Sequence, residues 1–69
     1  MEIKANLAGV VWQVLVSHGE EIIENQDVVI LESMKMEIPI ESEKSGKVKE
    51  VKVKEGDFVN EGDVLMVVV

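Results

Sequence analysis

Glycine residues divide the chain into two halves that resemble each other. Gly9 and Gly46 are 37 positions apart, and so are Gly19 and Gly56. The valines between them keep the same spacing: Val11, Val14 and Val16 in the first half match Val48, Val51 and Val53 in the second. The recurrence predicts an internal duplication. Two copies are fewer than the three or more that a solenoid needs, so we expect them to pair with each other about a pseudo-two-fold axis.

The spacing changes by one residue late in each half. Asp27-Val28 matches Asp63-Val64 at an offset of 36 rather than 37. We therefore expect the first copy to carry one extra residue in the loop before this dipeptide.

The residue types favour strands. The chain has 14 Val and 6 Ile but only 4 Leu and 2 Ala, and β-branched side chains pack well on a pleated sheet. Residues 47–54 are expected to form a strand, because 51–54 alternate between apolar and polar. Val48 and Val51 are three apart, which predicts a bulge or bend, and Val11 and Val14 predict the same in the first copy. A helix over 47–55 is the alternative, disfavoured by its valines and by the glycine that follows.

Short apolar runs and regular turns complete an all-β pattern. Residues 28–31 and 64–69 are expected to be buried strands, and each follows an acidic loop, 20–27 or 57–63. Turn signals that recur about every ten residues are typical of sandwiches and barrels. We expect one domain over residues 1–69, a flattened barrel of about eight short strands with four from each copy.

Composition excludes several classes of protein. The chain has no Cys and one His, which removes disulfides, a thiolate nucleophile and Cys/His zinc sites. Fourteen acidic residues against seven Lys give a net charge of −7, so we expect no nucleic-acid partner. The longest apolar run, Val64–Val69, is six residues, far too short to span a membrane. No signal-peptide pattern follows Met1, and a cytoplasmic protein is expected.

Several conspicuous residues are expected to be ordinary surface positions. His18 precedes a turn glycine and should be solvated. Trp12 stands where the second copy has Lys49, which predicts a partly buried side chain on the outer face. The five lysines between 44 and 54 alternate with Val and Glu and predict the solvated side of a strand, with a role in guiding a partner as the alternative.

One segment between the two copies breaks the local rules. Apolar residues alternate on both sides of residues 33–36, which predicts a hairpin with its turn there. Yet the stretch has no Gly, Asn, Asp or Pro, the residues that tight hairpin turns prefer. Lys35 stands at the tip between Met34 and Met36 instead. Local rules tend to fail where function constrains the sequence.

Two interpretations of this tip remain open on spacing alone. In one, Met34 and Met36 fold back to plug the barrel end and Lys35 is simply solvated. In the other, Lys35 is presented so that an external enzyme can acylate its amine. An amine in water is almost wholly protonated at neutral pH, so its activation would have to come from that enzyme.

The motifs around this tip resemble those of a known family. Glu32–Met36 is similar to the Glu-Ala-Met-Lys-Met signature of biotin carboxyl carrier domains, in the biotinyl/lipoyl attachment family. Ala5–Gly9 resembles the family's Ala-Pro-Met-x-Gly opening, and the Gly-acid pairs at 19 and 56 also fit. Ser33 replaces Ala, and Asn6 replaces Pro. The resemblance covers nearly the whole chain. The start at Met1 and the lack of an Ala/Pro-rich linker favour a small free-standing carrier, with a domain of a larger chain as the alternative.

The resemblance implies both a fold and a function. The fold would be two four-stranded antiparallel sheets with quasi-two-fold symmetry, a barrel-sandwich hybrid with the Lys on a hairpin turn opposite the termini. A biotin protein ligase would join biotin to Lys35, with Met34, Met36 and Glu32 as flanking recognition residues. The carrier, expected to be a monomer without catalytic residues or metal, would move carboxyl groups between the biotin carboxylase and carboxyltransferase sites of a biotin-dependent carboxylase.

Two alternatives to this function remain. A lipoyl carrier of a 2-oxo acid dehydrogenase or of the glycine cleavage system would use the same fold and lipoic acid on the same Lys35. Lipoyl domains usually have Asp-Lys-Ala at the tip, and the two Met speak against that reading. The other alternative is a binding or structural β module that is not acylated.

Overall fold

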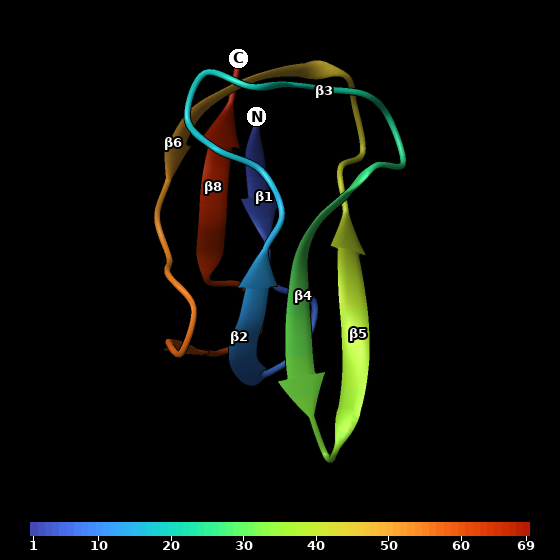
Figure 1. Cartoon of the computed structure of the whole chain (residues 1–69), viewed down its shortest axis with the longest axis vertical. Helices are drawn as coiled ribbons and strands as arrows, with labels where there is room; N and C mark the ends of the chain where they lie inside the picture. Colours follow the sequence, from blue (N-terminus) through green and yellow to red (C-terminus); the bar gives the residue numbers. More distant parts are fainter.

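Eight short strands account for the regular structure of the chain. The computed structural model describes residues 1–69, and its strands are β1 (Glu2–Lys4), β2 (Gly9–Val14), β3 (Glu21–Ile22), β4 (Asp27–Ser33), β5 (Met36–Glu41), β6 (Gly46–Val51), β7 (Phe58–Val59) and β8 (Val64–Val68). The expected all-β class and strand number are confirmed. The hairpin of β4 and β5 lies at one end of the long axis, and both termini lie at the other (Figure 1).

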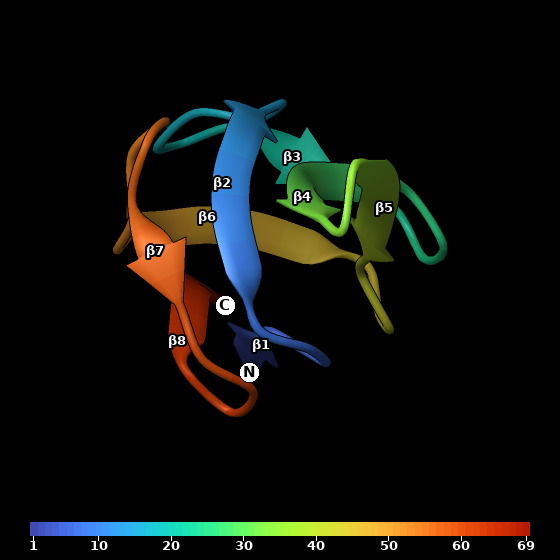
Figure 2. The ribbon, with the colours of Figure 1, turned by 90° about the horizontal axis from the view of Figure 1, so that it is seen from below.

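The strands form two four-stranded antiparallel sheets that face each other across the core (Figure 2). One sheet has the order β1-β8-β6-β3 and the other β5-β4-β2-β7. We call them the terminal sheet and the hairpin sheet. Replacing each strand by its counterpart in the other half converts one order into the other, so each sheet takes two strands from each copy. The flattened barrel and its quasi-two-fold symmetry are thereby confirmed.

The same hydrogen bonds recur in both copies. The Gly19 backbone N–H donates to the Val48 carbonyl over 2.7 Å, and the Gly56 N–H donates to the Val11 carbonyl over 2.8 Å. Each glycine lies in a turn at positive φ, 87° and 97°, where only a residue without Cβ is free of strain. Each of these glycines therefore lies where its copy crosses from one sheet to the other.

The repeat keeps a constant offset through the later loop. The Asn25 backbone N–H donates to the Ser42 carbonyl over 2.7 Å, and the Gly62 N–H donates to the Ala5 carbonyl over 2.8 Å. The two donors are 37 residues apart and so are the two acceptors, which makes Asp27 equivalent to Val64. The expectation of one extra residue in the first loop is therefore wrong. The Asp-Val dipeptides resemble each other in sequence, but they stand one position apart in the two backbones.

Bulges occur at the predicted places. The register of β2 against β4 shifts between Val11 and Gln13, which leaves Trp12 as an extra residue. The register of β6 against β8 shifts between Val48 and Glu50, which leaves Lys49 in the same position. Strand β6 ends at Val51 rather than at 54, because the chain then crosses to the hairpin sheet.

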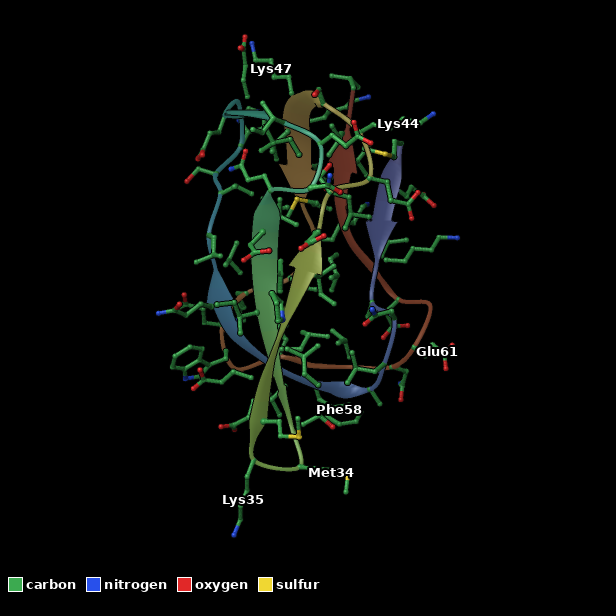
Figure 3. All side chains as sticks on the ribbon, turned by 90° about the vertical axis from the view of Figure 1, so that its right-hand side faces the viewer. Met34, Lys35, Lys44, Lys47, Phe58 and Glu61 are labelled. Atoms are coloured by element: carbon green, nitrogen blue, oxygen red, sulfur yellow. The ribbon has the colours of Figure 1, made fainter.

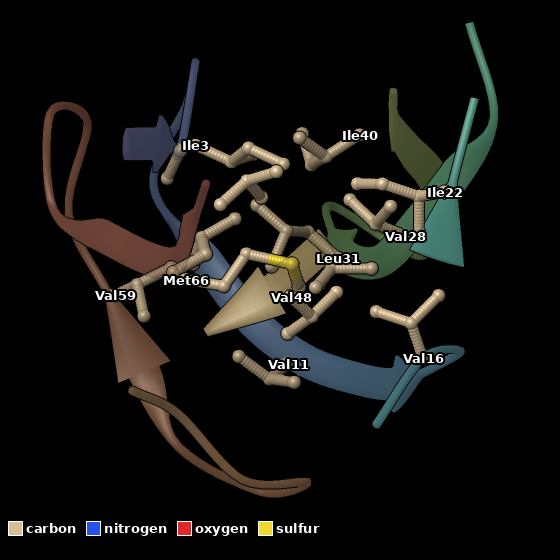
Figure 4. Close-up of a cluster of buried hydrophobic side chains, with 14 residues drawn as sticks. Ile3, Val11, Val16, Ile22, Val28, Leu31, Ile40, Val48, Val59 and Met66 are labelled. Carbon is tan, nitrogen blue, oxygen red and sulfur yellow. The ribbon is translucent and has the colours of Figure 1, made fainter. Parts of the chain in front are cut away.

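One apolar cluster lies between the sheets (Figure 4). Its most deeply buried members come from the two central strand pairs, β2 with β4 and β6 with β8, and include Leu31, Leu65 and Met66. Gly9 and Gly46 are required by close packing. A Cβ on Gly9 would lie 2.7 Å from the Glu32 carbonyl oxygen, and one on Gly46 would lie 2.7 Å from that of Val69.

Candidate functional site

The β4–β5 hairpin projects the predicted tip from the body of the barrel. The two strands stay in register up to the pair Ser33 and Met36, so the turn contains only Met34 and Lys35. The turn thus falls within residues 33–36, as the sequence predicted. Because β4 and β5 are hydrogen-bonded partners along the hairpin, and β4 also pairs with β2, a sheet ladder holds the tip in place.

The turn has an unfavourable backbone for its residues. Met34 has a φ of 52° and Lys35 a φ of 64°. Positive φ at both central residues is what a type I′ hairpin turn requires, and Asn-Gly or Asp-Gly usually supplies it. For a residue with a Cβ, this conformation costs about 1–2 kcal/mol. The sequence therefore accepts strain at the tip in order to place Met and Lys there.

The side chains of the tip are exposed. Met34 is 91% and Met36 62% exposed, so the interpretation in which they plug the barrel end is wrong. Lys35 is also exposed and points away from the body of the protein (Figure 3). The ion pairs of the structure are Lys4 with Glu2 and Lys52 with Glu50, so the Lys35 ammonium is not held by a carboxylate.

Two carboxylates lie behind the tip. Glu32 and Glu37 are direct cross-strand partners, one pair removed from Ser33 and Met36. Like charges in such a position repel. The register thus places Glu32 close to the turn, with Glu37, which the sequence analysis does not include among the site residues, directly opposite it.

Two apolar residues continue this row across the sheet. Val10 on β2 is the partner of Glu32, and Phe58 on β7 is the partner of Val10. Sequence reasoning did not connect them with the tip, because their position depends on the strand order of the hairpin sheet. The internal repeat offered one signal, since Phe58 and Val10 stand where the other copy has Glu21 and Lys47.

The remaining candidate residues lie on the surface as expected. Trp12 is partly exposed, and His18 and the lysines at 44, 47, 49, 52 and 54 are exposed. The two surface hollows are lined by other segments, one by Lys4, Asn25 and Ser42 among others, and one by Ile22, Ile23 and Ser45 among others. No group of three or more His, Cys, Asp or Glu is placed to hold a metal ion. No helix has the length and hydrophobicity needed to cross a membrane.

Taken together, these features let the tip do one kind of chemistry. It presents a primary amine at the end of a rigid hairpin, open to a large partner from most directions. No imidazole, carboxylate or hydroxyl contacts that amine as a general base. An amine of this kind can accept an acyl group from an enzyme that supplies the activation, and the group would then be carried at the far end of the barrel from the termini.

Comparison with known proteins gives consistent matches. The family model described as "Biotin-requiring enzyme" matches residues 1–68. The chain is 61% identical over 66 residues to the biotin/lipoyl attachment protein of Bacillus subtilis, covering 96% of this chain and 90% of that protein. It is 39% identical over 67 residues to the "biotinylated protein TB7.3 homolog" of Mycobacterium leprae, covering 97% and 94%.

A solved structure agrees with the fold in detail. Urea carboxylase from Kluyveromyces lactis superposes on this chain with a TM-score of 0.93 at 32% identity. The match covers 100% of this chain and 6% of the carboxylase. The fold of this chain therefore matches that of one small part of the much larger carboxylase chain.

Proposed function

The chain belongs to the biotin/lipoyl attachment family and is a carrier rather than an enzyme, and from this premise we propose that it is a biotin carrier modified at Lys35. The observation that carries the proposal is the Met34–Met36 tip. Its lysine is exposed on a strained two-residue turn and flanked by two exposed Met. Neither the strain nor the exposure has a use in folding.

The proposed modification is an amide bond. The Lys35 ε-amine displaces AMP from a biotinyl-adenylate, the C–N bond forms as the C–O bond to AMP breaks, and the amine loses a proton. The amide is neutral, so the formal charge of the chain changes from −7 to −8. When attached, biotin supplies the carboxyl-carrying chemistry. The chain itself supplies tethering, which offers the group to a partner site at an effective concentration of roughly millimolar.

The partners follow from this role. A biotin protein ligase loads the carrier, with Met34, Met36 and Glu32 as recognition residues, and biotin carboxylase and carboxyltransferase sites then use it. The name of the Mycobacterium leprae relative supports biotin as the attached group, and the name of the Kluyveromyces lactis enzyme supports a carboxylase as the partner. We propose that residues 1–69 form a single attachment domain, that it is monomeric because seven net negative charges per chain oppose self-association, and that it is cytoplasmic.

Lipoylation of the same lysine is the second candidate. The Bacillus subtilis relative is named for both cofactors, and a hairpin lysine serves either one. The two flanking Met still favour biotin, because they differ from the Asp-Lys-Ala tip typical of lipoyl domains.

Mass spectrometry of the co-expressed protein tests the proposal. With a biotin ligase, the wild-type chain should gain one biotinyl group, mapped to Lys35 by peptide analysis. Lys35→Arg should gain none, whereas Lys44→Arg, a control at the other end of the barrel, should be labelled like the wild type. Labelling of Lys35→Arg would overturn the site. Incubating the chain with a biotin ligase and a lipoate ligase, together with both cofactors, distinguishes a biotin carrier from a lipoyl carrier. Lipoylation without biotinylation would make the lipoyl carrier the preferred function.

A further inference from the structure

The outer faces of the two sheets differ although their backbones are equivalent. On the terminal sheet, Glu21 and Lys47 are cross-strand partners, and at the equivalent place on the hairpin sheet Phe58 is the partner of Val10. All four side chains are exposed. The fold thus accepts a pair of opposite charges at a position where the hairpin sheet carries two apolar residues.

Two further positions show the same difference. Trp12 stands at the bulge where the other copy has Lys49, and Pro39 stands where the other copy has Glu2. These side chains are exposed as well. We name the four apolar residues of the hairpin sheet, Val10, Trp12, Pro39 and Phe58, the apolar face.

The apolar face has a cost in water and no evident role in packing. Phe58 is 65%, Trp12 43% and Val10 37% exposed. Val10 and Phe58 are direct cross-strand partners, and exposed apolar neighbours commonly mark a site of interaction. The internal duplication provides the comparison, because charged residues fill the equivalent positions of the same fold. Folding alone therefore does not explain the apolar face.

This face is continuous with the lysine hairpin. Val10 pairs with Glu32, and Glu32 pairs with Glu37. This row lies two residues from the turn, about 7 Å along the strands. Figure 3 shows Phe58 at the same end of the molecule as Met34 and Lys35. A protein that encloses the tip from this side must cover the row.

The opposed carboxylates define the chemistry of the occupant. Glu32 and Glu37 have no ion-pair partner within the chain, and they would attract an arginine or lysine on a partner. A second copy of this chain would instead bring a net charge of −7 and another pair of carboxylates. The complementary surface is a protein with an apolar patch beside a basic side chain.

We propose that the apolar face is the docking surface for the biotin protein ligase, with Glu32 and Glu37 facing a basic residue of that enzyme. The inference rests on the function proposed above. The ligase must bring the Lys35 nitrogen itself to the acyl carbon, so its surface has to close over the rows beside the turn. Carboxylase sites are reached through the longer biotinyl-lysine arm and require less contact with the hairpin sheet.

Exchanging residues between the two faces tests the docking surface. The double variant Trp12→Lys, Phe58→Glu places on the hairpin sheet the residue types that stand at the equivalent positions of the terminal sheet. The two new charges are opposite, so the net charge of the chain is unchanged. With biotin, ATP and purified ligase, kcat/KM for this carrier should fall at least about tenfold, mainly through KM. The control Lys49→Glu, Glu21→Lys reverses two charges on the terminal sheet, also without net change, and should stay within about twofold of the wild type.

The outcomes separate the two proposals. A folded double variant with wild-type kcat/KM would overturn the docking surface alone, whereas a wild-type chain that accepts no biotin would overturn the proposed function. Sedimentation of the apo-protein is a further arm. Wild-type dimers that the double variant cannot form would assign the face to a second copy and overturn its assignment to the ligase.

A second measurement does not depend on the folding of the double variant. Trp12 is the only tryptophan of the chain, so 5-fluorotryptophan gives one ¹⁹F resonance on the apolar face. Lys35→Arg carrier with this label should bind unlabelled ligase without turnover, and its resonance should shift or broaden. An unchanged resonance, under conditions in which the Lys35→Arg carrier inhibits biotinylation of the wild-type carrier by competing for the ligase, would overturn the proposal.

Discussion

Glu32 and Glu37 stand directly opposite each other on β4 and β5, and one residue pair, Ser33 with Met36, separates them from the turn. Neither carboxylate is neutralised by a lysine of the chain. An opposed pair of like charges weakens a ladder, and this one lies in the hairpin that must hold the tip in position.

Removing one of these charges should stabilise the domain. For Glu37→Gln we expect a gain of about 0.2–1 kcal/mol in the free energy of unfolding, measured by urea denaturation at low ionic strength. The gain should shrink in 1 M salt, because salt screens exposed charges. Glu43→Gln, a control in the loop after β5, should show no comparable gain. A loss of stability in Glu37→Gln would mean that the two carboxylates do not repel in the folded state.

The strained turn leads to a second prediction. Asn tolerates positive φ better than Met, so Met34→Asn should raise the free energy of unfolding by about 1 kcal/mol. If Met34 is read by the ligase, the same variant should be biotinylated more slowly than the wild type. A more stable hairpin with a lower kcat/KM would show that the turn sequence serves recognition rather than folding.

Met36→Asn is the matched control for the turn. Met36 begins β5, where its backbone is extended and Asn is a poor strand former. It should therefore bring no stabilisation. Equal stabilisation by both substitutions would contradict the assignment of strain to residue 34.

The repeated loops supply a third prediction. Asn25 has a φ of 70° and its equivalent Gly62 a φ of 92°. Because the first copy already uses Asn here, Gly62→Asn should cost less than about 1 kcal/mol, whereas Gly62→Val should cost about 2 kcal/mol, since a β-branched residue is strained at positive φ. Thermal unfolding of both variants tests this. Similar losses for Asn and Val would show that the two loops are not equivalent.

How far the sequence predicts this molecule depends on the range of the interactions. The hairpin and its lysine were predictable, because alternation on both sides of residues 33–36 fixes two strands that are adjacent in sequence. The bulges at Trp12 and Lys49 were predictable from valine spacing. The prediction of a changed offset near Asp27 was wrong, because the two Asp-Val dipeptides match in sequence but not in backbone position. Equivalent backbone positions are identified by repeated hydrogen bonds, such as the one from the Asn25 N–H to the Ser42 carbonyl.

Long-range placement could not be read in the same way. Phe58 reaches the neighbourhood of Glu32 only because β7 pairs with β2 and β2 with β4. Nothing local to Phe58 distinguishes it from a residue of the other sheet. Once the sheet order is known, however, the repeat becomes informative again, since each surface residue can be compared with its equivalent in the other copy.

Gly9 and Gly46 give the last prediction, in which equal damage to the fold should have unequal effects on function. A Cβ on Gly9 would lie 2.7 Å from the Glu32 carbonyl oxygen, and one on Gly46 would lie 2.7 Å from that of Val69. Backbone atoms cannot move aside as flexible side chains do. Each Gly→Ala change should therefore cost about 1–3 kcal/mol of unfolding free energy, the usual penalty for overpacking.

The two variants should differ when the ligase acts on folded protein. Gly9→Ala displaces β2 from β4 beside Glu32, within the proposed docking surface, and should lower kcat/KM several-fold at a temperature where both variants are folded. Gly46→Ala disturbs the terminal sheet, and its folded fraction should be biotinylated at the wild-type rate. If both variants slow the ligase equally, the enzyme responds to the general stability of the barrel, and the geometry around Glu32 has no special part in recognition.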